Sequence, residues 1–479
     1  MLLLSERRAR RVAIALFGTL SACGATQPPT DPPPHPGPPS TAVLRVRVDS
    51  LAEAFQRETR AVGLTVGVMR GSDTVTLKGY GLADREANRP AAAATVYRVG
   101  SITKQFTAAA VLQFVEQGRA RLDDTLGAYL PQYARWSGVT MRQLLNHTSG
   151  IPSYTASARW AARMRDALPP DSVLAFVADA PMQFAPGARF AYSNTNYFLL
   201  GRVLERLTGR PYADDMRARF FAPLGMRTAA YCPDEPASPD HAHGYDGPGT
   251  PRPSTPISMT SPYSAGALCM SVPDFLRWQA ALTGGRVVSP STYARMSSGD
   301  SLTTGAPIDY GWGLVTGTIG GRRVVDHGGD INGFSADQLW LPDDSLRVVV
   351  FTNTLGSNPA RLAQNIARAA LGQPLRAAPA ALATVALPDD LRAAVAGTYT
   401  LRLPDGATLP LRLWDEGGQL MAQASGPGQS AFPLLYVGDQ TFAAAFDPTL
   451  RLRIVTREGR GIRAVLNQRG VTLEGARTP

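Results

Sequence analysis

Residues 99–104 read Val99-Gly100-Ser101-Ile102-Thr103-Lys104, and they lead into a long apolar segment. Over residues 102–117 the apolar side chains fall on nearly every side of a helix, and Gly118 follows as a residue that commonly ends one. A helix that is apolar all round is usually buried in the centre of a domain. We therefore predict a buried helix over 102–117, with Ser101 and Lys104 at its start.

Ser101 and Lys104 have the chemistry of a nucleophile and its activating base. Lys104 lies one helical turn after Ser101, so the two side chains face the same way. A serine hydroxyl is a poor nucleophile until a base removes its proton, and burial can lower the pKa of a lysine enough for this task. The alternative is that Ser101 only caps the helix and Lys104 faces solvent. Lysine is scarce, because only Lys78 and Lys104 stand among 48 lysine and arginine residues, and this favours the catalytic interpretation.

Two further motifs carry reactive groups. In Tyr192-Ser193-Asn194 a phenol and an amide stand at alternate positions, which an extended segment points the same way. Tyrosine can act as a general base, and asparagine can bind a substrate amide or carbonyl. The other motif places His327 before two glycines, which let a substrate approach the backbone closely. The alternatives are a tyrosine on a surface turn and a glycine-rich turn with a surface histidine.

Taken together and in this order, the three motifs resemble the signature of the serine β-lactamase and penicillin-binding-protein superfamily. Their detail resembles the branch that contains class C β-lactamases, D-alanyl-D-alanine carboxypeptidases, D-aminopeptidases and related esterases. The resemblance spans about residues 44–372. The motifs are Ser101-x-x-Lys104, Tyr192-x-Asn194 and His327-x-Gly329, supported by Leu144-Leu145-Asn146-His147-Thr148-Ser149-Gly150, Pro223-Leu224-Gly225-Met226 and Tyr310-Gly311-Trp312-Gly313.

The resemblance implies a serine hydrolase in which Ser101 attacks a carbonyl and forms an acyl-enzyme. It implies that Lys104 and Tyr192 share the role of base, and the sequence does not divide that role between them. It also implies an oxyanion hole made by the backbone N–H groups of Ser101 and Asp330. The expected substrate is a D-amino-acid peptide, a β-lactam or a small ester, and no cofactor is expected. The substrate-binding residues that it implies are Asn194, His327, Gly329 and Asp330.

His327 departs from the class C pattern, which has lysine at this position. A histidine at pH 7 is mostly neutral unless its pKa is shifted, so it is a weaker partner for a β-lactam carboxylate. We therefore expect a peptidase, an amidase or an esterase ahead of a β-lactamase. A catalytically inactive envelope binding protein on the same scaffold is the alternative of another class, and the intact Ser101, Lys104 and Tyr192 argue against it.

The motifs lie within residues 43–373, where strand patterns at both ends enclose helical patterns. This order predicts an α/β body with a second lobe. Together with the resemblance it gives a β-lactamase-like two-lobed fold, in which an antiparallel sheet with flanking helices adjoins a mostly helical lobe. The patterns are a helix over 43–59, strands over 64–69, 74–80, 324–327 and 346–352, and a helix over 358–371.

The residues after this body change character. Residues 374–388 are rich in alanine and proline and are typical of a linker. Residues 389–479 contain short β-rich runs divided by glycine, proline or aspartate, which predicts a small all-β barrel or sandwich. This unit resembles the lipocalin-like domains of some D-aminopeptidase relatives. The runs are 398–402, 408–414, 419–424, 441–446, 451–456 and 461–468.

The N-terminal residues 1–23 have the pattern of a lipoprotein signal peptide. Arginines precede a short apolar run, and Leu20-Ser21-Ala22-Cys23 then resembles a bacterial lipobox in which Cys23 carries the lipid. A proline-rich linker over 24–42 follows as a spacer. We expect an exported lipoprotein of the cell envelope, at the periplasmic or outer-membrane face, that meets the membrane only through its lipid anchor.

The remaining cysteines, histidines and charges suggest three other kinds of site. Cys232 and Cys269 can pair in an oxidising compartment, so a disulfide is a hypothesis. His241-x-His243 resembles a metal pair, but no cysteine or acidic cluster of ligand spacing accompanies it, so we predict no metal site. The net charge of +10 suggests an anionic partner. Because the arginines are scattered and dense only over residues 7–11, we expect no nucleic-acid partner.

Overall fold

The computed structural model describes residues 37–236, 238–247, 250–376, 384–403, 408–424, 432–444, 447–468 and 471–478. The predicted signal peptide with Cys23, and most of the predicted linker over 24–42, lie outside these ranges. The first helix, α1 (Thr41–Thr59), begins inside that predicted linker. Among the described residues no helix is both long and apolar enough to cross a membrane.

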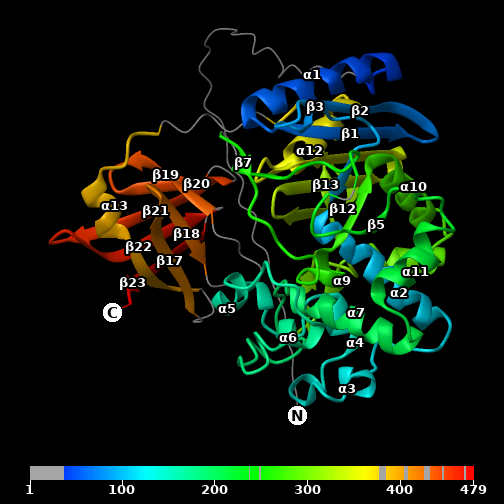
Figure 1. Cartoon of the computed structure of the whole chain (residues 1–479), viewed down its shortest axis with the longest axis horizontal. Coiled ribbons are helices and arrows are strands. Elements are labelled where there is room, and N and C mark those ends of the chain that lie inside the picture. Colours follow the sequence, from blue (N-terminus) through cyan, green and yellow to red (C-terminus); the bar gives the residue numbers. More distant parts are fainter. Residues whose placement is uncertain are drawn as a thin grey trace, which may run out of the picture. The chain divides into compact units, whose positions relative to one another are not determined.

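A seven-stranded antiparallel sheet forms the centre of the body (Figure 1). Its order is β11-β12-β13-β14-β1-β2-β3, so strands from both ends of the body pair in its middle. Val66 of β1 lies opposite Val350 of β14 on one side and Lys78 of β2 on the other, which confirms the predicted hairpin and late strand. The strands are β1 (Gly63–Arg70), β2 (Asp73–Asp84), β3 (Arg89–Pro90), β11 (Val315–Ile319), β12 (Arg322–Ile331), β13 (Phe334–Leu341) and β14 (Leu346–Thr352).

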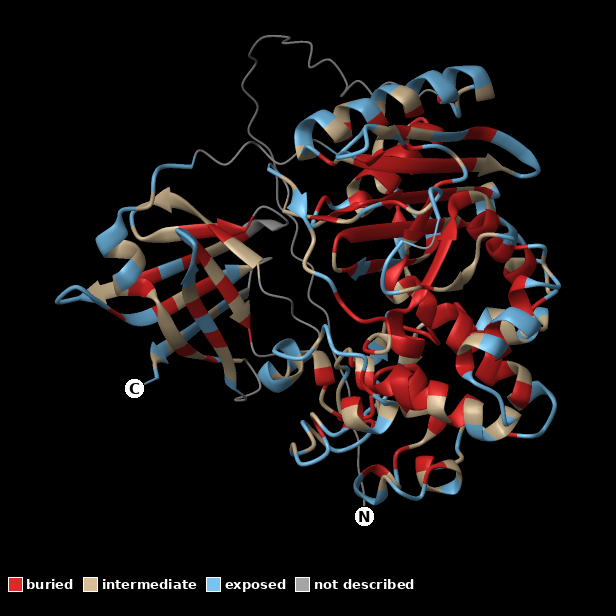
Figure 2. Ribbon diagram, in the orientation of Figure 1, coloured by how far each residue is buried: buried red, intermediate tan, exposed pale blue. Residues whose placement is uncertain are grey.

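Helices cover both faces of this sheet. On one face α1 packs beside α12 (Pro359–Ala370), whose first turn is capped by the Asn358 side chain. On the other face α10 (Val272–Thr283) packs against β1 and β14. Figure 2 shows the strands between these helices as largely buried. The apolar face of each helix thus packs against the sheet, and the two together form a helix–sheet core.

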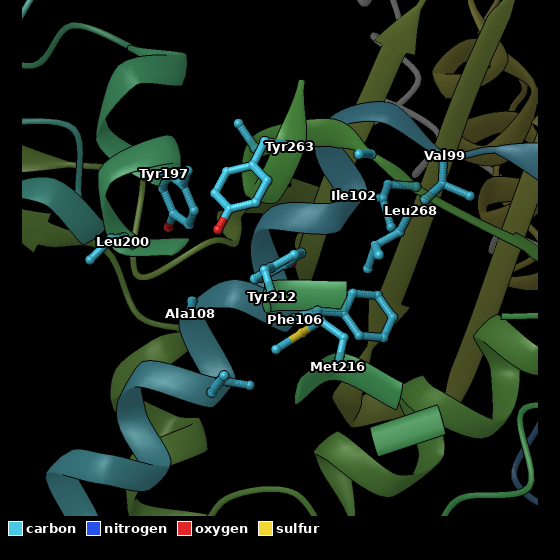
Figure 3. Packing of buried hydrophobic residues seen from close by; sticks show 14 of the residues in the cluster. Val99, Ile102, Phe106, Ala108, Tyr197, Leu200, Tyr212, Met216, Tyr263 and Leu268 are labelled. Atoms are coloured by element: carbon cyan, nitrogen blue, oxygen red, sulfur yellow. The ribbon is translucent and has the colours of Figure 1, made fainter. Parts of the chain in front are cut away.

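The second lobe is mostly helical and is built around α2 (Thr103–Glu116). Every side chain from Thr103 to Leu112 is buried, which confirms the predicted central helix. Phe106 stacks on Trp278 with ring centroids 3.8 Å apart, and Figure 3 shows Met216 near Phe106. The other helices of the body are α3 (Leu126–Tyr129), α4 (Met141–Leu145), α5 (Ala158–Ala161), α6 (Pro170–Leu174), α7 (Asn194–Thr208), α8 (Tyr212–Met216), α9 (Tyr263–Gly266) and α11 (Pro290–Met296).

The C-terminal residues form a closed eight-stranded barrel, in which β23 pairs back onto β16. Buried side chains such as Leu401, Phe442 and Ile454 fill its core, as in other small barrels. The predicted all-β unit is confirmed, but β19, β23 and the helix α13 (Asp389–Val395) are additions to the prediction. The strands are β16 (Gly397–Arg402), β17 (Thr408–Glu416), β18 (Gln419–Ala424), β19 (Phe432–Gly438), β20 (Thr441–Ala444), β21 (Asp447–Arg457), β22 (Arg460–Gln468) and β23 (Val471–Arg477).

Candidate active site

Ser101 lies in a tight turn that connects a small sheet to the start of α2. Strand β4 (Val96–Arg98) pairs with β8 (Leu268–Ser271), and the Val99 N–H donates to the Leu268 carbonyl at 3.0 Å. Gly100 has a φ of +51°, and a Cβ there would lie 2.9 Å from the Asp330 carbonyl oxygen. Glycine adopts this conformation without strain and leaves room for Asp330, so Gly100 sets the position of Ser101.

Lys104 reaches Ser101 from the first turn of α2, as predicted. Its Nζ lies 3.0 Å from Ser101 Oγ and 2.8 Å from both Asn194 Oδ1 and the Ala265 carbonyl oxygen. The side chain is completely buried. Burial lowers the pKa of Lys104 well below its usual value, since a charged ammonium loses its hydration there. Burial therefore favours the neutral amine beside the serine hydroxyl.

Tyr192 approaches Ser101 as a second partner. Its phenol hydrogen-bonds to Ser101, and the centroid of its ring lies 4.8 Å from Lys104 Nζ. Burial raises the pKa of Tyr192, and this effect outweighs the hydrogen bond to Ser101. The phenol is therefore protonated at neutral pH and can donate to Ser101 Oγ.

Asn194 stands at the start of α7, and its side chain is engaged within the protein. Its Oδ1 accepts from Lys104, and its Nδ2 donates to Thr155 Oγ1 at 3.2 Å. Its backbone N–H donates to Ser153 Oγ at 3.1 Å. These bonds fix Asn194 as a partner of the lysine, while its contact with substrate stays a prediction.

His327 lies on β12 with both ring nitrogens bonded. Nδ1 is 2.6 Å from the Gly328 carbonyl oxygen, so Nδ1 carries the proton. Nε2 is 3.0 Å from the phenol of Tyr310 and therefore accepts from it. Burial, with a smaller contribution from Lys104, lowers the pKa of His327 to about 4. At pH 7 His327 is thus a neutral group, in line with the expectation from the sequence.

Gly329 allows β12 to approach the turn that carries Ser101. A Cβ at this position would lie 2.0 Å from the Val99 carbonyl oxygen and 2.9 Å from the Ser101 nitrogen. The backbone of Gly329 therefore lies directly against Ser101, and Asp330 follows in the chain. The carboxylate of Asp330 accepts a hydrogen bond from Ser335 Oγ. The role of the Ser101 and Asp330 N–H groups in the oxyanion hole stays a prediction.

Residues 48–373 match the family model named Beta-lactamase. The chain belongs to this family. It is similar to D-aminopeptidases from Brucella canis, with 30% identity over 337 residues, and from Cereibacter sphaeroides, with 31% identity over 332 residues. Each match covers 68% of this chain and 63% of the relative, so the chain spans less than two thirds of the length of these relatives.

Solved structures share the fold of this Beta-lactamase family member. A D-stereospecific amidohydrolase from Streptomyces sp. is 28% identical, with a TM-score of 0.59 over 69% of this chain and 98% of that one. An octameric penicillin-binding protein homologue from Pyrococcus abyssi is 24% identical, with a TM-score of 0.61 over 90% of this chain and 99% of that one. The second likeness shows the fold alone.

The two cysteines of the body are free thiols, so the hypothesised disulfide is not present in the structure. Strand β5 (Ala230–Tyr231) pairs with β8 so that Ala230 lies opposite Cys269, and the Cys232 N–H donates to the Ala267 carbonyl. The thiols are near enough to hydrogen-bond. The two cysteines are diagonal neighbours on this strand pair, and a disulfide between them in an oxidising compartment stays a prediction.

The histidine pair His241 and His243 has no ligand cluster around it. His243 Nε2 instead lies 3.6 Å from Asp84 Oδ2. In the part of the chain that the structure describes, no three histidine, cysteine or acidic side chains gather in a way that could hold a metal ion.

Sequence reasoning missed several partners of this Beta-lactamase family site. The Ala265 carbonyl gives no side-chain signal, because only its backbone oxygen reaches Lys104. Thr155 accepts a hydrogen bond from Asn194, a residue that lies far from it in sequence. Tyr310 and His147 appear only as members of supporting stretches, and those stretches are the available signal for them.

Proposed function

We propose that the protein is a serine hydrolase that forms an acyl-enzyme on Ser101 and cleaves amide or ester bonds of D-amino-acid peptides, amides or small esters. The observation that carries this proposal is the buried Lys104 Nζ, 3.0 Å from Ser101 Oγ and bonded otherwise to uncharged oxygens. Burial and the absence of a carboxylate among these partners both favour the neutral amine, which is the form that can act as a base. The D-aminopeptidases and the D-stereospecific amidohydrolase to which the chain is similar support the substrate class.

The hydrogen bonds of Lys104 assign the first proton transfer. A neutral lysine has two N–H bonds and one lone pair. Asn194 Oδ1 and the Ala265 carbonyl only accept, so they take the two N–H bonds, and the lone pair is left for the Ser101 hydroxyl. Lys104 therefore removes the Ser101 proton as Oγ forms its bond to the substrate carbonyl carbon.

The raised pKa of Tyr192 indicates that its phenol supplies the proton in the second transfer. The protonated phenol, already bonded to Ser101, donates its proton to the leaving nitrogen or oxygen as that bond breaks. The proton on Lys104 then restores the phenol. Water releases the acyl group by the same steps in reverse, while the backbone N–H groups of Ser101 and Asp330 stabilise the oxyanion.

The neutral His327 narrows the substrate class. Both of its nitrogens are bonded, one to Gly328 and one to Tyr310, so it offers no cation to a substrate carboxylate. Substrates with an uncharged leaving group, such as amides and esters, fit this site better than β-lactams or carboxypeptidase substrates, which carry a free carboxylate on the leaving group.

The cell envelope is the proposed location. The pattern of residues 1–23, the lipobox at Cys23 and the proline-rich residues after it support an exported lipoprotein on a lipid tether. A partner other than a peptide or small-molecule substrate is not required by the site.

The mass of the intact protein tests the proposed function. The protein is exposed briefly to an activated short-chain ester, a D-aminoacyl anilide and benzylpenicillin, beside its Ser101→Ala variant. We expect a mass adduct or turnover with the ester and the anilide in the wild type only. No adduct and no turnover with any of the three would contradict the proposal and favour the inactive binding protein.

A further inference from the structure

His147 accepts hydrogen bonds from the residues on both sides of Tyr192. It lies just after α4 with a φ of +59° and is completely buried. Its carbonyl accepts the Ala191 N–H at 3.0 Å, and its Nδ1 accepts the Ser193 N–H at 3.2 Å. The residues directly before and after Tyr192 are therefore both tied to one histidine.

The ring of His147 also packs on the phenol ring itself. The ring centroids of His147 and Tyr192 are 4.3 Å apart, which is the shortest of four aromatic contacts around this histidine. Tyr310 follows at 4.8 Å and Tyr197 at 5.1 Å. The chain on both sides of Tyr192 and the ring of Tyr192 are thus held by the same residue.

The hydrogen bonds around His147 fix its tautomer. Ser149 Oγ accepts the Ile151 N–H at 3.0 Å, so its own hydrogen is free to donate to Asn196 Oδ1 at 2.7 Å. This orients the Asn196 amide so that its nitrogen, 3.3 Å from His147 Nδ1, is the donor. Nδ1 therefore accepts from both Ser193 and Asn196.

Acceptance at Nδ1 places the ring hydrogen on Nε2. Burial, followed by the nearby Lys104 and His327, lowers the pKa of His147 well below its usual value, so the ring stays neutral. Nε2 is buried and makes no hydrogen bond among the described residues, and it is enclosed by the aromatic rings. The Nε2 hydrogen of His147 therefore has no partner among the described residues to which it could pass.

We propose that His147 is a positioning residue that aims the phenol of Tyr192 at Ser101 and at the leaving group. This inference rests on the proposed function, because it assigns how Tyr192 is held for its proton transfer. It predicts that the defect of a His147 variant depends on how much the leaving group needs a proton.

Two substrates with different leaving groups test this role. An activated phenyl ester departs without protonation, whereas an anilide or amide requires a proton from Tyr192. His147→Asn keeps an acceptor and tolerates a positive φ but removes the ring, and His147→Phe keeps a ring but removes the acceptor. We expect each variant to lower kcat for the anilide about 10- to 100-fold, as for a misplaced catalytic group. For the activated ester, the fold-loss in kcat should be less than about a tenth of the fold-loss for the anilide. KM should change little for either substrate.

Tyr192→Phe supplies the matched comparison. It should show the same bias against the anilide, and His147→Asn should add little in the Tyr192→Phe background, because both act through one group. His243→Asn, a half-exposed histidine beside Asp84, is the control that should leave both rates unchanged. Circular dichroism and thermal melting establish that each variant is folded, and His147→Asn carries the test if His147→Phe does not fold.

Equal losses for ester and anilide, or additive losses in the double variant, would overturn the positioning role and leave His147 as a packing residue. Turnover by the wild type reports separately on the proposed function. A wild type that acylates no substrate refutes that function, whereas an active wild type with unbiased His147 variants refutes only this inference.

Discussion

The two lysines of the chain form similar hydrogen bonds in opposite surroundings. Lys78 Nζ lies 2.9 Å from Asp49 Oδ1, and Lys104 Nζ lies 2.8 Å from Asn194 Oδ1. The side chain of Lys78 is 51% exposed, whereas Lys104 is buried completely. One acceptor is a carboxylate at the surface, and the other is a neutral amide in the interior.

This difference in surroundings separates a structural cation from a base. A carboxylate at this distance stabilises an ammonium, so Lys78 takes part in an ion pair. The amide of Asn194 and the carbonyl of Ala265 stabilise the ammonium of Lys104 much less, and burial removes its hydration. The side chain is the same in both places, so the environment alone makes Lys104 reactive.

The largest expected effect comes from removing the buried lysine. Lys104→Met keeps the volume of the side chain but has no lone pair for the Ser101 proton. We expect kcat/KM for the activated ester to fall about 10²- to 10⁴-fold, the usual contribution of a general base. Lys78→Met is the matched control and should stay within about twofold of the wild type, since it touches no site residue. Steady-state kinetics measures both, and equal losses in the two variants would refute the contrast.

The next largest effect comes from giving Lys104 the acceptor that Lys78 has. Asn194→Asp places a carboxylate 2.8 Å from Nζ and favours the ammonium, so it raises the pKa of Lys104. The base works only when it is neutral, so kcat/KM rises with pH as Lys104 loses its proton. The pH–rate profile should therefore move to higher pH, by about 1 to 3 units for an opposite charge at this range.

Asn194→Ala separates this charge effect from the loss of a hydrogen bond. It removes the amide without adding a charge, so it should lower the rate without a comparable alkaline shift. A profile for Asn194→Asp that rises at the same pH as the wild type would show that Lys104 is not the group that titrates.

Much of this fold could be predicted because its signals are local. The glycine turn and the apolar period after Ser101 specify α2, and the spacing in α1 specifies the buried residues Leu44, Val48 and Phe55. The pairing of β1 with β14 joins residues almost 300 positions apart, and only the resemblance suggested it. Strand β19 contains Pro433 and β23 contains Gly475, two residues that weaken a strand pattern.

The residues of the candidate site also fall into those that the sequence predicted and those that it did not. Ser101, Lys104 and Tyr192 are visible because their side chains are reactive and their motifs are spaced as in the resembling family. The Ala265 carbonyl is invisible because any residue carries one. The neutral state of His327 follows from its burial and from the nearby Lys104, and a sequence motif shows neither the burial nor this proximity.

A smaller effect is expected when the surface acceptor is made neutral. Asp49→Asn gives Lys78 the kind of acceptor that Lys104 has, and it weakens the bond from Tyr80, 2.7 Å away. Because a third of the Asp49 side chain is exposed, we expect a loss of about 1 kcal/mol in the free energy of unfolding and no change in kcat. Denaturant unfolding measures the first and ester kinetics the second.

The pH dependence of this loss has a defined sign. Burial alone would raise the pKa of Asp49, but the hydrogen bonds from Tyr80 and Lys78 outweigh it and lower the pKa. The stabilisation is therefore complete above the unfolded pKa, about 3.9, and is lost as the pH falls through the lower folded value. The difference in stability between wild type and Asp49→Asn should shrink on going from pH 7 to pH 3. A constant difference would place the stabilisation in packing.

The smallest effect is the one that Lys78→Met should have on the free energy of unfolding. Exposed ion pairs contribute about 0.2–1 kcal/mol, and Tyr80 still holds Asp49 when Lys78 is absent. We expect a loss below about 0.5 kcal/mol at low salt that disappears at 1 M salt, where surface charges are screened. The substitution also removes the ammonium that lies over the Tyr80 ring, 4.9 Å from its centroid. A larger loss that persists in high salt would mean that Lys78 acts through packing, and the contrast with Lys104 would then rest on burial alone.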